Sequence, residues 1–119
     1  MIAHASLAVS DYATAKEFYR KALAPLGYEF TDDHPEWGAG GYKEGGNTSF
    51  WIGQKDKVVG GHVAFEAKDK NQVENFYKEA LAAGAKDNGK PGYRPDYWPG
   101  YYAAFVHDTD GNNVEAVWF

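Results

Sequence analysis

An internal repeat is the feature that most constrains the fold of this chain. Residues 4–24 (HASLAVSDYATAKEFYRKALA) align with residues 62–82 (HVAFEAKDKNQVENFYKEALA) without a gap, at a constant offset of 58 residues. The matched positions include the first histidine, one aspartate, a Phe-Tyr pair and an Ala-Leu-Ala triplet. A register kept over this length indicates a duplicated unit. In a chain of 119 residues, the repeat predicts two small modules, residues 1–57 and 58–119, that share one core.

Each module begins with the same two elements. A short strand-like run leads to an aspartate, Asp11 or Asp69, at the position of a helix N-cap. Apolar residues then recur at i, i+3, i+4, i+7 and i+8, which is the spacing of an amphipathic helix. A glycine, Gly27 or Gly84, follows each of these runs and predicts the end of the helix.

Strands are predicted after each helix. In the second module, Tyr102–Val106 and Val114–Phe119 flank a turn rich in Asp, Gly and Asn, which is typical of a β-hairpin. Residues 41–54 (GYKEGGNTSFWIGQ) form the counterpart in the first module. Residues 87–100 (DNGKPGYRPDYWPG) contain three prolines and are predicted to form a loop rather than a strand. The pattern predicts an α+β fold built from two duplicated βαβββ modules.

Three polar residues are predicted to lie on the strand faces opposite to those on which the helices would pack. Because side chains alternate along a strand, His4, His62 and Glu115 oppose the uniformly apolar faces on which the helices would pack. Two imidazoles and one carboxylate form a ligand set for Zn²⁺, Ni²⁺, Mn²⁺ or Fe²⁺ that leaves positions open for substrate. The ordinary alternative is a surface histidine at each strand start and a glutamate that points to water.

Composition narrows the classes of partner. The net charge of −5 and the lack of any Lys/Arg cluster argue against nucleic acid and anionic membranes. The chain has no cysteine, so metal ligands must be histidines and carboxylates. No apolar run is long enough to cross a bilayer, and no basic start followed by an apolar stretch is present. We therefore expect a soluble, cytoplasmic protein whose ligand is a small molecule.

The segment 91–102 (PGYRPDYWPGYY) offers further candidate residues. Arg94 is one of only two arginines and could bind a carboxylate or phosphate bidentately, although an ion pair with the nearby Asp96 is the more ordinary expectation. Tyr93, Tyr97 and Trp98 could line the mouth of a substrate cleft. Tyrosine, tryptophan and arginine are also enriched at protein interfaces, so the same residues could be anchors of a dimer.

Residues 4–30 (HASLAVSDYATAKEFYRKALAPLGYEF) and 101–119 (YYAAFVHDTDGNNVEAVWF) resemble the vicinal oxygen chelate superfamily, which includes glyoxalases, bleomycin-resistance proteins and extradiol dioxygenases. The resemblance implies paired βαβββ modules whose mixed sheet curls around a cleft, with the helices on the outer face. It implies that His4, His62 and Glu115 are metal ligands. The last strand of the first module, TSFWIGQ, has no residue suited to be a fourth ligand, and Trp51 could instead wall a binding pocket.

The function implied by the resemblance is that of a glyoxalase-like, metal-dependent enzyme of the lyase, isomerase or dioxygenase type. It would act on a small oxygen-rich substrate chelated to a divalent metal ion, and Glu115 is the one candidate for a catalytic carboxylate. Arg94, Tyr93, Tyr97 and Trp51 are the candidate substrate-binding residues. The alternatives are a non-catalytic protein that binds an antibiotic or toxin, as bleomycin-resistance proteins do, and a catalytically silent relative. A homodimer is expected in each case.

Overall fold

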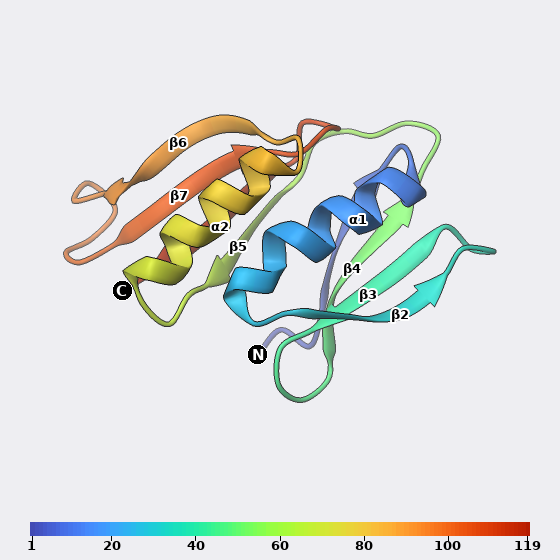
Figure 1. Cartoon of the computed structure of the whole chain (residues 1–119), viewed down its shortest axis with the longest axis horizontal. Helices are drawn as coiled ribbons and strands as arrows, with labels where there is room; N and C mark the ends of the chain where they lie inside the picture. The colour runs from blue at the N-terminus through green and yellow to red at the C-terminus, as the bar shows by residue number, and fades with distance from the viewer.

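Each half of the chain folds into a four-stranded sheet with one helix packed on it, in a computed structural model that describes residues 1–119 (Figure 1). The first half contains β1 (Ala5–Val9), α1 (Tyr12–Leu23), the 3₁₀ helix η1 (Ala24–Leu26), β2 (Glu29–His34), β3 (Ala39–Lys43) and β4 (Thr48–Gln54). The second half contains β5 (His62–Glu66), α2 (Lys70–Ala82), β6 (Lys86–Tyr93), β7 (Tyr102–His107) and β8 (Asn113–Trp118). The α+β class and the βαβββ order of each module are confirmed.

The two sheets have the same topology. The strand order is β1-β4-β3-β2 in the first sheet and β5-β8-β7-β6 in the second. In each sheet the strand before the helix pairs in parallel with the last strand, β1 with β4 and β5 with β8, and the other pairs are antiparallel. The expected module boundary between residues 57 and 58 lies in the connection from β4 to β5.

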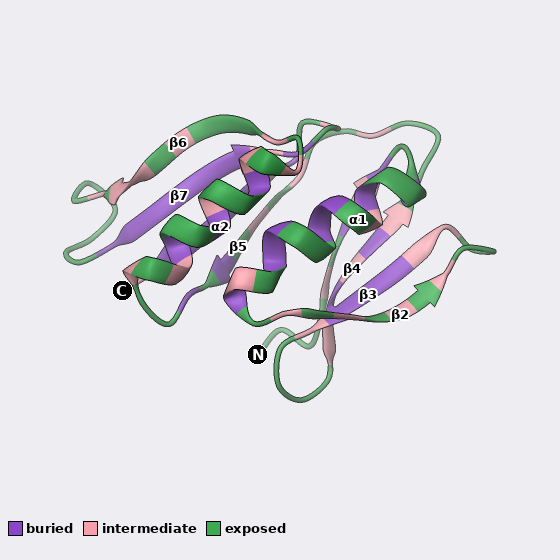
Figure 2. Cartoon of the chain, in the orientation of Figure 1, coloured by how far each residue is buried: buried purple, intermediate pink, exposed green.

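Both helices begin where the sequence places their caps. The side chain of Asp11 accepts a hydrogen bond from the backbone N–H of Thr14, and that of Asp69 accepts one from Gln72 at 2.8 Å. Neither helix is long and apolar enough to cross a lipid bilayer. The apolar side of each helix is buried, as Figure 2 shows in purple.

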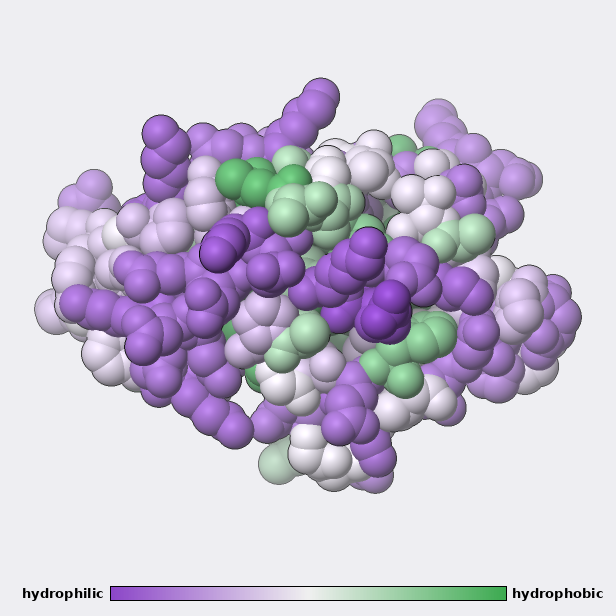
Figure 3. Space-filling view, in the orientation of Figure 1, coloured by the Kyte–Doolittle hydropathy of each residue, from purple (hydrophilic) through white to green (hydrophobic).

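One core joins the two modules. It contains the inward side chains of both helices and of strands from both sheets, and the rings of Phe50 and Phe65 meet edge to face across the module boundary with centroids 5.0 Å apart. Because α1 and α2 pack on each other as well as on their own sheets, the two sheets lie side by side behind the helix pair (Figure 1). The surface over the helices is mostly hydrophilic (Figure 3).

The opposite face of each sheet is covered by no helix, and we call it the open face. On the first sheet it carries His4, Ser6, Ala8 and Trp51, and on the second it carries His62, Glu115 and Phe105. The alternation predicted for these strands is therefore observed. The two sheets do not close around a cleft within one chain, because the helix pair holds them side by side rather than face to face.

A buried polar network fastens the modules together. The amide of Asn112, which is 0% exposed, donates to the backbone carbonyl of Ala8 at 2.9 Å and to Asp108 at 2.9 Å, and it accepts from the backbone N–H of Gly61 at 2.8 Å. The hydroxyl of Tyr19 in α1 donates to the same carboxylate of Asp108. The turn between β7 and β8 is thereby tied to β1 and to the residue that precedes β5.

The prediction that residues 87–100 form a loop was wrong for residues 87–93. This segment is most of β6, which pairs with β7 through two irregularities in register. Pro91 is tolerated because β6 is an edge strand, where no neighbour needs its missing N–H. Gly89, with a φ of 155°, lies between the irregular pairs and allows the bulge. Residues 94–101 form the loop.

Candidate functional site

Two of the expected ligands meet on the open face of the second sheet. His62 is the first residue of β5, and Glu115 lies on β8 opposite Ala64 in the parallel ladder. Since His62 and Ala64 are two residues apart, both side chains lie on the same side of the strand. The imidazole Nε2 of His62 is 3.2 Å from Oε2 of Glu115.

The surroundings of this pair orient both side chains. The other ring nitrogen of His62, Nδ1, lies 3.0 Å from the backbone carbonyl of Asn113. The second carboxylate oxygen of Glu115 accepts a hydrogen bond from the hydroxyl of Tyr101. Burial, together with this contact, raises the pKa of Tyr101 far above its ordinary value, so the hydroxyl remains a donor. Glu115 is 3% exposed, whereas about half of the His62 side chain is open to solvent.

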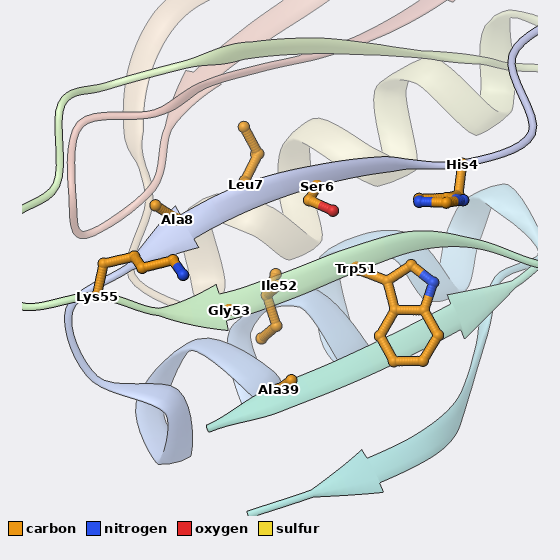
Figure 4. A pocket seen from close by; sticks show the side chains of 9 residues that line it. All are labelled: His4, Ser6, Leu7, Ala8, Ala39, Trp51, Ile52, Gly53 and Lys55. Carbon is orange, nitrogen blue, oxygen red and sulfur yellow. The ribbon is translucent and has the colours of Figure 1, made fainter. Parts of the chain in front are cut away.

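His4 does not join this pair within one chain. It lies beside Trp51 at one end of a hollow of about 780 Å³ on the open face of the first sheet, with Lys55 at the other end (Figure 4). No residue of the second sheet lines this hollow. His4 also borders a smaller hollow of about 440 Å³ at the seam between the sheets, near Ala64. No three histidine, aspartate or glutamate side chains of a single chain form a group that could hold a metal ion.

Trp51 lies flat across the first sheet. A Cβ at Gly41 on the neighbouring strand would stand 3.1 Å from Cη2 of the indole, so glycine at this position makes room for the ring. The ring of His34 is nearly parallel to that of Trp51, with centroids 6.4 Å apart, and it stacks on Trp37 at 4.4 Å. Three flat rings thus lie in a row, and of these only Trp51 lines the hollow beside His4. No pattern in the sequence indicates this stack, because His34 has no partner at ligand spacing.

A second aromatic group surrounds the hydroxyl that holds Glu115. Tyr97 and Trp98 meet the ring of Tyr101 edge to face, and Phe119 stacks on it with planes 6° apart. Tyr97, Trp98 and Phe119 are each about half exposed. The expected substrate-binding residue Tyr97 therefore lies near Glu115, on the other side of Tyr101. Tyr97 and Trp98 of the loop cover the ring of Tyr101.

Two other candidates lie elsewhere than expected. The ring of Tyr93 packs against Tyr102 and under the ammonium group of Lys70, so it is on the helix side of the second sheet and away from Glu115. The expected ion pair between Arg94 and Asp96 is absent. The guanidinium instead donates to backbone carbonyls and lies over Phe105, because the loop turns at residues 94–97 and separates the two side chains.

Tyr101 is the functional contact that the sequence analysis did not single out among the tyrosines of this segment. It precedes Tyr102, Ala103, Ala104 and Phe105, and the alternation of that strand would have put Tyr101 on the same side as Ala103 and Phe105. Phe105 is the direct cross-strand partner of Glu115. The signal was therefore present in the parity of the strand.

The comparisons with known proteins agree with this architecture. The family model of the Glyoxalase/Bleomycin resistance protein/Dioxygenase superfamily matches residues 1–116. The chain belongs to this superfamily. A comparison with curated protein sequences gave no match.

Solved structures show the same fold at low sequence identity. A glyoxalase/bleomycin resistance protein from Albidiferax ferrireducens T118 is 23% identical, with a TM-score of 0.85 over 98% of each chain. A lactoylglutathione lyase from Agrobacterium tumefaciens is 21% identical, with a TM-score of 0.75 over 99% of this chain and 92% of that one. A glyoxalase-related enzyme from Fulvimarina pelagi is 17% identical, with a TM-score of 0.75 over 100% of this chain and 88% of that one. At these identities the likeness concerns the fold.

Proposed function

We propose that the protein is a metal-dependent, glyoxalase-like enzyme that acts on a small oxygen-rich substrate. His62 and Glu115 would hold a divalent ion of the Zn²⁺, Ni²⁺, Mn²⁺ or Fe²⁺ type, and His4 of a second copy of the chain would complete the set. The observation that carries the proposal is the 3.2 Å approach of His62 Nε2 to Glu115 Oε2 on an open face.

The hydrogen bonds of His62 fit a metal ligand. Both ring nitrogens lie within reach of an acceptor, the carbonyl of Asn113 at Nδ1 and the carboxylate of Glu115 at Nε2. A neutral imidazole carries one N–H, so it can donate to only one of the two. When Nδ1 donates to the carbonyl, the lone pair of Nε2 is directed to the carboxylate side, as in histidines that bind metals. A cation between Nε2 and Oε2 would satisfy both groups.

The environment of Glu115 favours a cation as well. The carboxylate is 3% exposed, and no Lys or Arg side chain forms an ion pair with it. A buried carboxylate without a positive partner is costly, and the hydroxyl of Tyr101 supplies only one neutral hydrogen bond. Either a protonated His62 or a bound metal ion would supply the missing charge.

A homodimer would bring the third ligand. His4 lies on the open face of the first sheet, beside the hollow next to Trp51, whereas His62 and Glu115 lie on that of the second. In a two-fold dimer, the open face of the first sheet of one copy can cover the second sheet of the other. That contact would also cover the exposed aromatic side chains beside Glu115, which are Tyr97, Trp98 and Phe119.

A metal ion held at such a site would supply Lewis-acid catalysis at two substrate oxygens. A divalent ion with open positions would accept both oxygens and stabilise negative charge that develops on them. In this chain Glu115 is held by Tyr101 in one orientation, and the protonated hydroxyl of Tyr101 serves as a donor rather than as a base. Glu115 is the one carboxylate at this pair, so it would have to leave the ion, at least through one oxygen, to act in proton transfer.

A second candidate function rests on the first sheet. The hollow of about 780 Å³, with Trp51 flat on its floor, suits a planar ligand that stacks on the indole. A protein that binds an aromatic antibiotic or toxin without metal needs no more than this. If the protein has this function, Trp51→Ala should abolish binding of the planar ligand, and wild-type protein should bind the ligand equally well with and without metal.

Metal analysis tests the main proposal. Protein purified without chelators should bind about one divalent ion per chain after addition of Zn²⁺, Ni²⁺, Mn²⁺ or Fe²⁺, and Glu115→Gln should weaken the binding at least about ten-fold. Glu79→Gln is the matched control, because Glu79 is exposed on α2 and its substitution removes the same charge. Wild-type protein without metal uptake, or a Glu115→Gln variant that binds like the control, would overturn the proposal.

A further inference from the structure

Arg94 presents a guanidinium group without a carboxylate partner on the open face of the second sheet. Its Nη2 donates to the backbone carbonyl of Lys90 at 2.7 Å, and its Nη1 is 3.5 Å from that of Tyr93. None of the ion pairs of the structure includes it. Two of its five N–H groups are therefore engaged with neutral acceptors, and the others remain available to a ligand.

The backbone forms a trough in which the guanidinium lies. The side chain passes over Gly89 and Gly92 of β6, where an added Cβ would come within 3.2 Å of Nη2 and 3.1 Å of Nη1. The ring of Phe105 lies beneath it, with Cζ of Arg94 5.4 Å from the ring centroid. The two glycines and the ring fix the plane of the guanidinium, which reduces the entropy lost when it binds an anion.

The trough lies on the same face as the candidate metal ligands. Phe105 is the cross-strand partner of Glu115, and Gly89 is the next partner of Phe105 along the same row of the sheet. Neighbouring strands are about 4.8 Å apart, and β6 is two strands away from β8, so the guanidinium over β6 lies roughly 10 Å from the backbone of Glu115. The buried side chain of Phe105 lies between the two charged groups.

We propose that Arg94 is an anion subsite for the substrate, which makes the substrate class an anionic chelator. This rests on the proposed function for the chelating end alone. The substrate would carry two vicinal oxygens at the His62–Glu115 pair, a short spacer, and a carboxylate or phosphate group on Arg94. Its anionic group takes bidentate hydrogen bonds from the guanidinium.

Charge makes the subsite selective. The chain has a net charge of −5, so an anionic substrate is repelled by the surface as a whole and is favoured only where a local positive group receives it. A neutral substrate of the same shape gains nothing from Arg94. The binding contributed by this residue should also weaken as ionic strength rises, because the guanidinium is partly exposed.

Anion binding by the metal-free protein tests the subsite directly. Benzoate and phenylphosphonate are the probes and benzyl alcohol is the neutral control, with binding followed by NMR titration of backbone amides at low salt. Wild-type protein should bind both anions with shifts at Gly89, Gly92 and Phe105, and Arg94→Gln should weaken this binding about ten-fold. Arg94→Lys, which keeps the charge but loses the planar fork, should fall between the two. Arg20→Gln is the matched control, because Arg20 is the only other arginine and pairs with Glu17 on α1.

The outcomes separate the subsite from the proposed function. If the protein takes up no metal but benzoate binding depends on Arg94, the proposed enzyme fails and the subsite stands. If Arg94→Gln binds both anions as tightly as wild type and as Arg20→Gln, or if wild type binds neither anion, the subsite is refuted whatever the metal content. Binding of phenylphosphonate alone supports the subsite and restricts the substrate to phosphate-like groups.

Discussion

Replacing Asn112 by alanine should destabilise the fold far more than its position in a turn suggests. The substitution removes three hydrogen bonds of 2.8–2.9 Å from a side chain that is 0% exposed, one of them to the carboxylate of Asp108. Two neutral bonds at about 1 kcal/mol each and one charge-assisted bond at about 1.5–3 kcal/mol give a loss of about 3–5 kcal/mol. That is a large share of the roughly 5–15 kcal/mol by which domains of this kind are stable.

The adjacent residue supplies a matched control. Asn113→Ala removes one exposed hydrogen bond, in which the side-chain amide of Asn88 donates to that of Asn113 at 3.2 Å. The free energy of unfolding should fall by less than about 1 kcal/mol. Urea unfolding followed by tryptophan fluorescence, at equal protein concentration and with unchanged m-values, measures both variants. A loss below about 1 kcal/mol for Asn112→Ala, or a loss equal to that of the control, would refute the claim that this network fastens the modules together.

Three further predictions follow from buried or paired tyrosines. Tyr19→Phe removes the donor to the buried carboxylate of the β7–β8 turn and should cost about 1–3 kcal/mol in the same unfolding assay. Tyr101→Phe should weaken metal binding by about ten-fold, measured by competition with a chromophoric chelator, because the carboxylate of Glu115 loses its orienting hydrogen bond. The hydrogen bond from Tyr12 lowers the pKa of Asp33 below its ordinary 3.8, so its stabilising effect is complete above the unfolded-state pKa and is lost as pH falls through the lower folded-state value. Asp33→Asn should therefore lose less stability than wild type between about pH 5 and pH 3, and equal losses would contradict this.

The fold followed from patterns that depend on backbone geometry alone. The repeat, the helical spacing of apolar residues and the alternation along strands predict both helices, the final hairpin and the open-face position of Glu115. Each of these patterns reports a face that must be buried. Wherever buried residues recur at a regular spacing, the element can therefore be predicted from the sequence alone.

What the sequence did not predict depends on contacts between segments. The sequence predicts a loop in place of β6 because its glycines and Pro91 are unfavourable in a central strand, and only the strand order shows that β6 is an edge strand. Proximity in sequence predicts an ion pair between Arg94 and Asp96. In the folded loop, the guanidinium of Arg94 instead donates to a backbone carbonyl and lies over the ring of Phe105. The stack of His34 on Trp37 and Trp51 likewise brings together residues from three segments.

The position of His4 shows a different limit. Alternation placed His4, His62 and Glu115 on faces without helices, but it does not specify whether two such faces meet within one chain or between two chains. The packing of α1 on α2 decides this, because it holds the open faces of one chain side by side. In the proposed enzyme, His4 of a second copy of the chain would therefore have to complete the site.

Metal binding by a hybrid dimer tests the central claim most directly. Chains carrying His4→Ala and His62→Ala are produced together with different affinity tags, and the dimers that carry both tags are isolated. If the ligands come from two chains, one site of each hybrid keeps all three, so the hybrid should bind about half the metal of the wild-type dimer while either variant alone binds almost none. A hybrid that binds no metal although the wild type does, or a wild-type protein that never dimerises, would contradict the account.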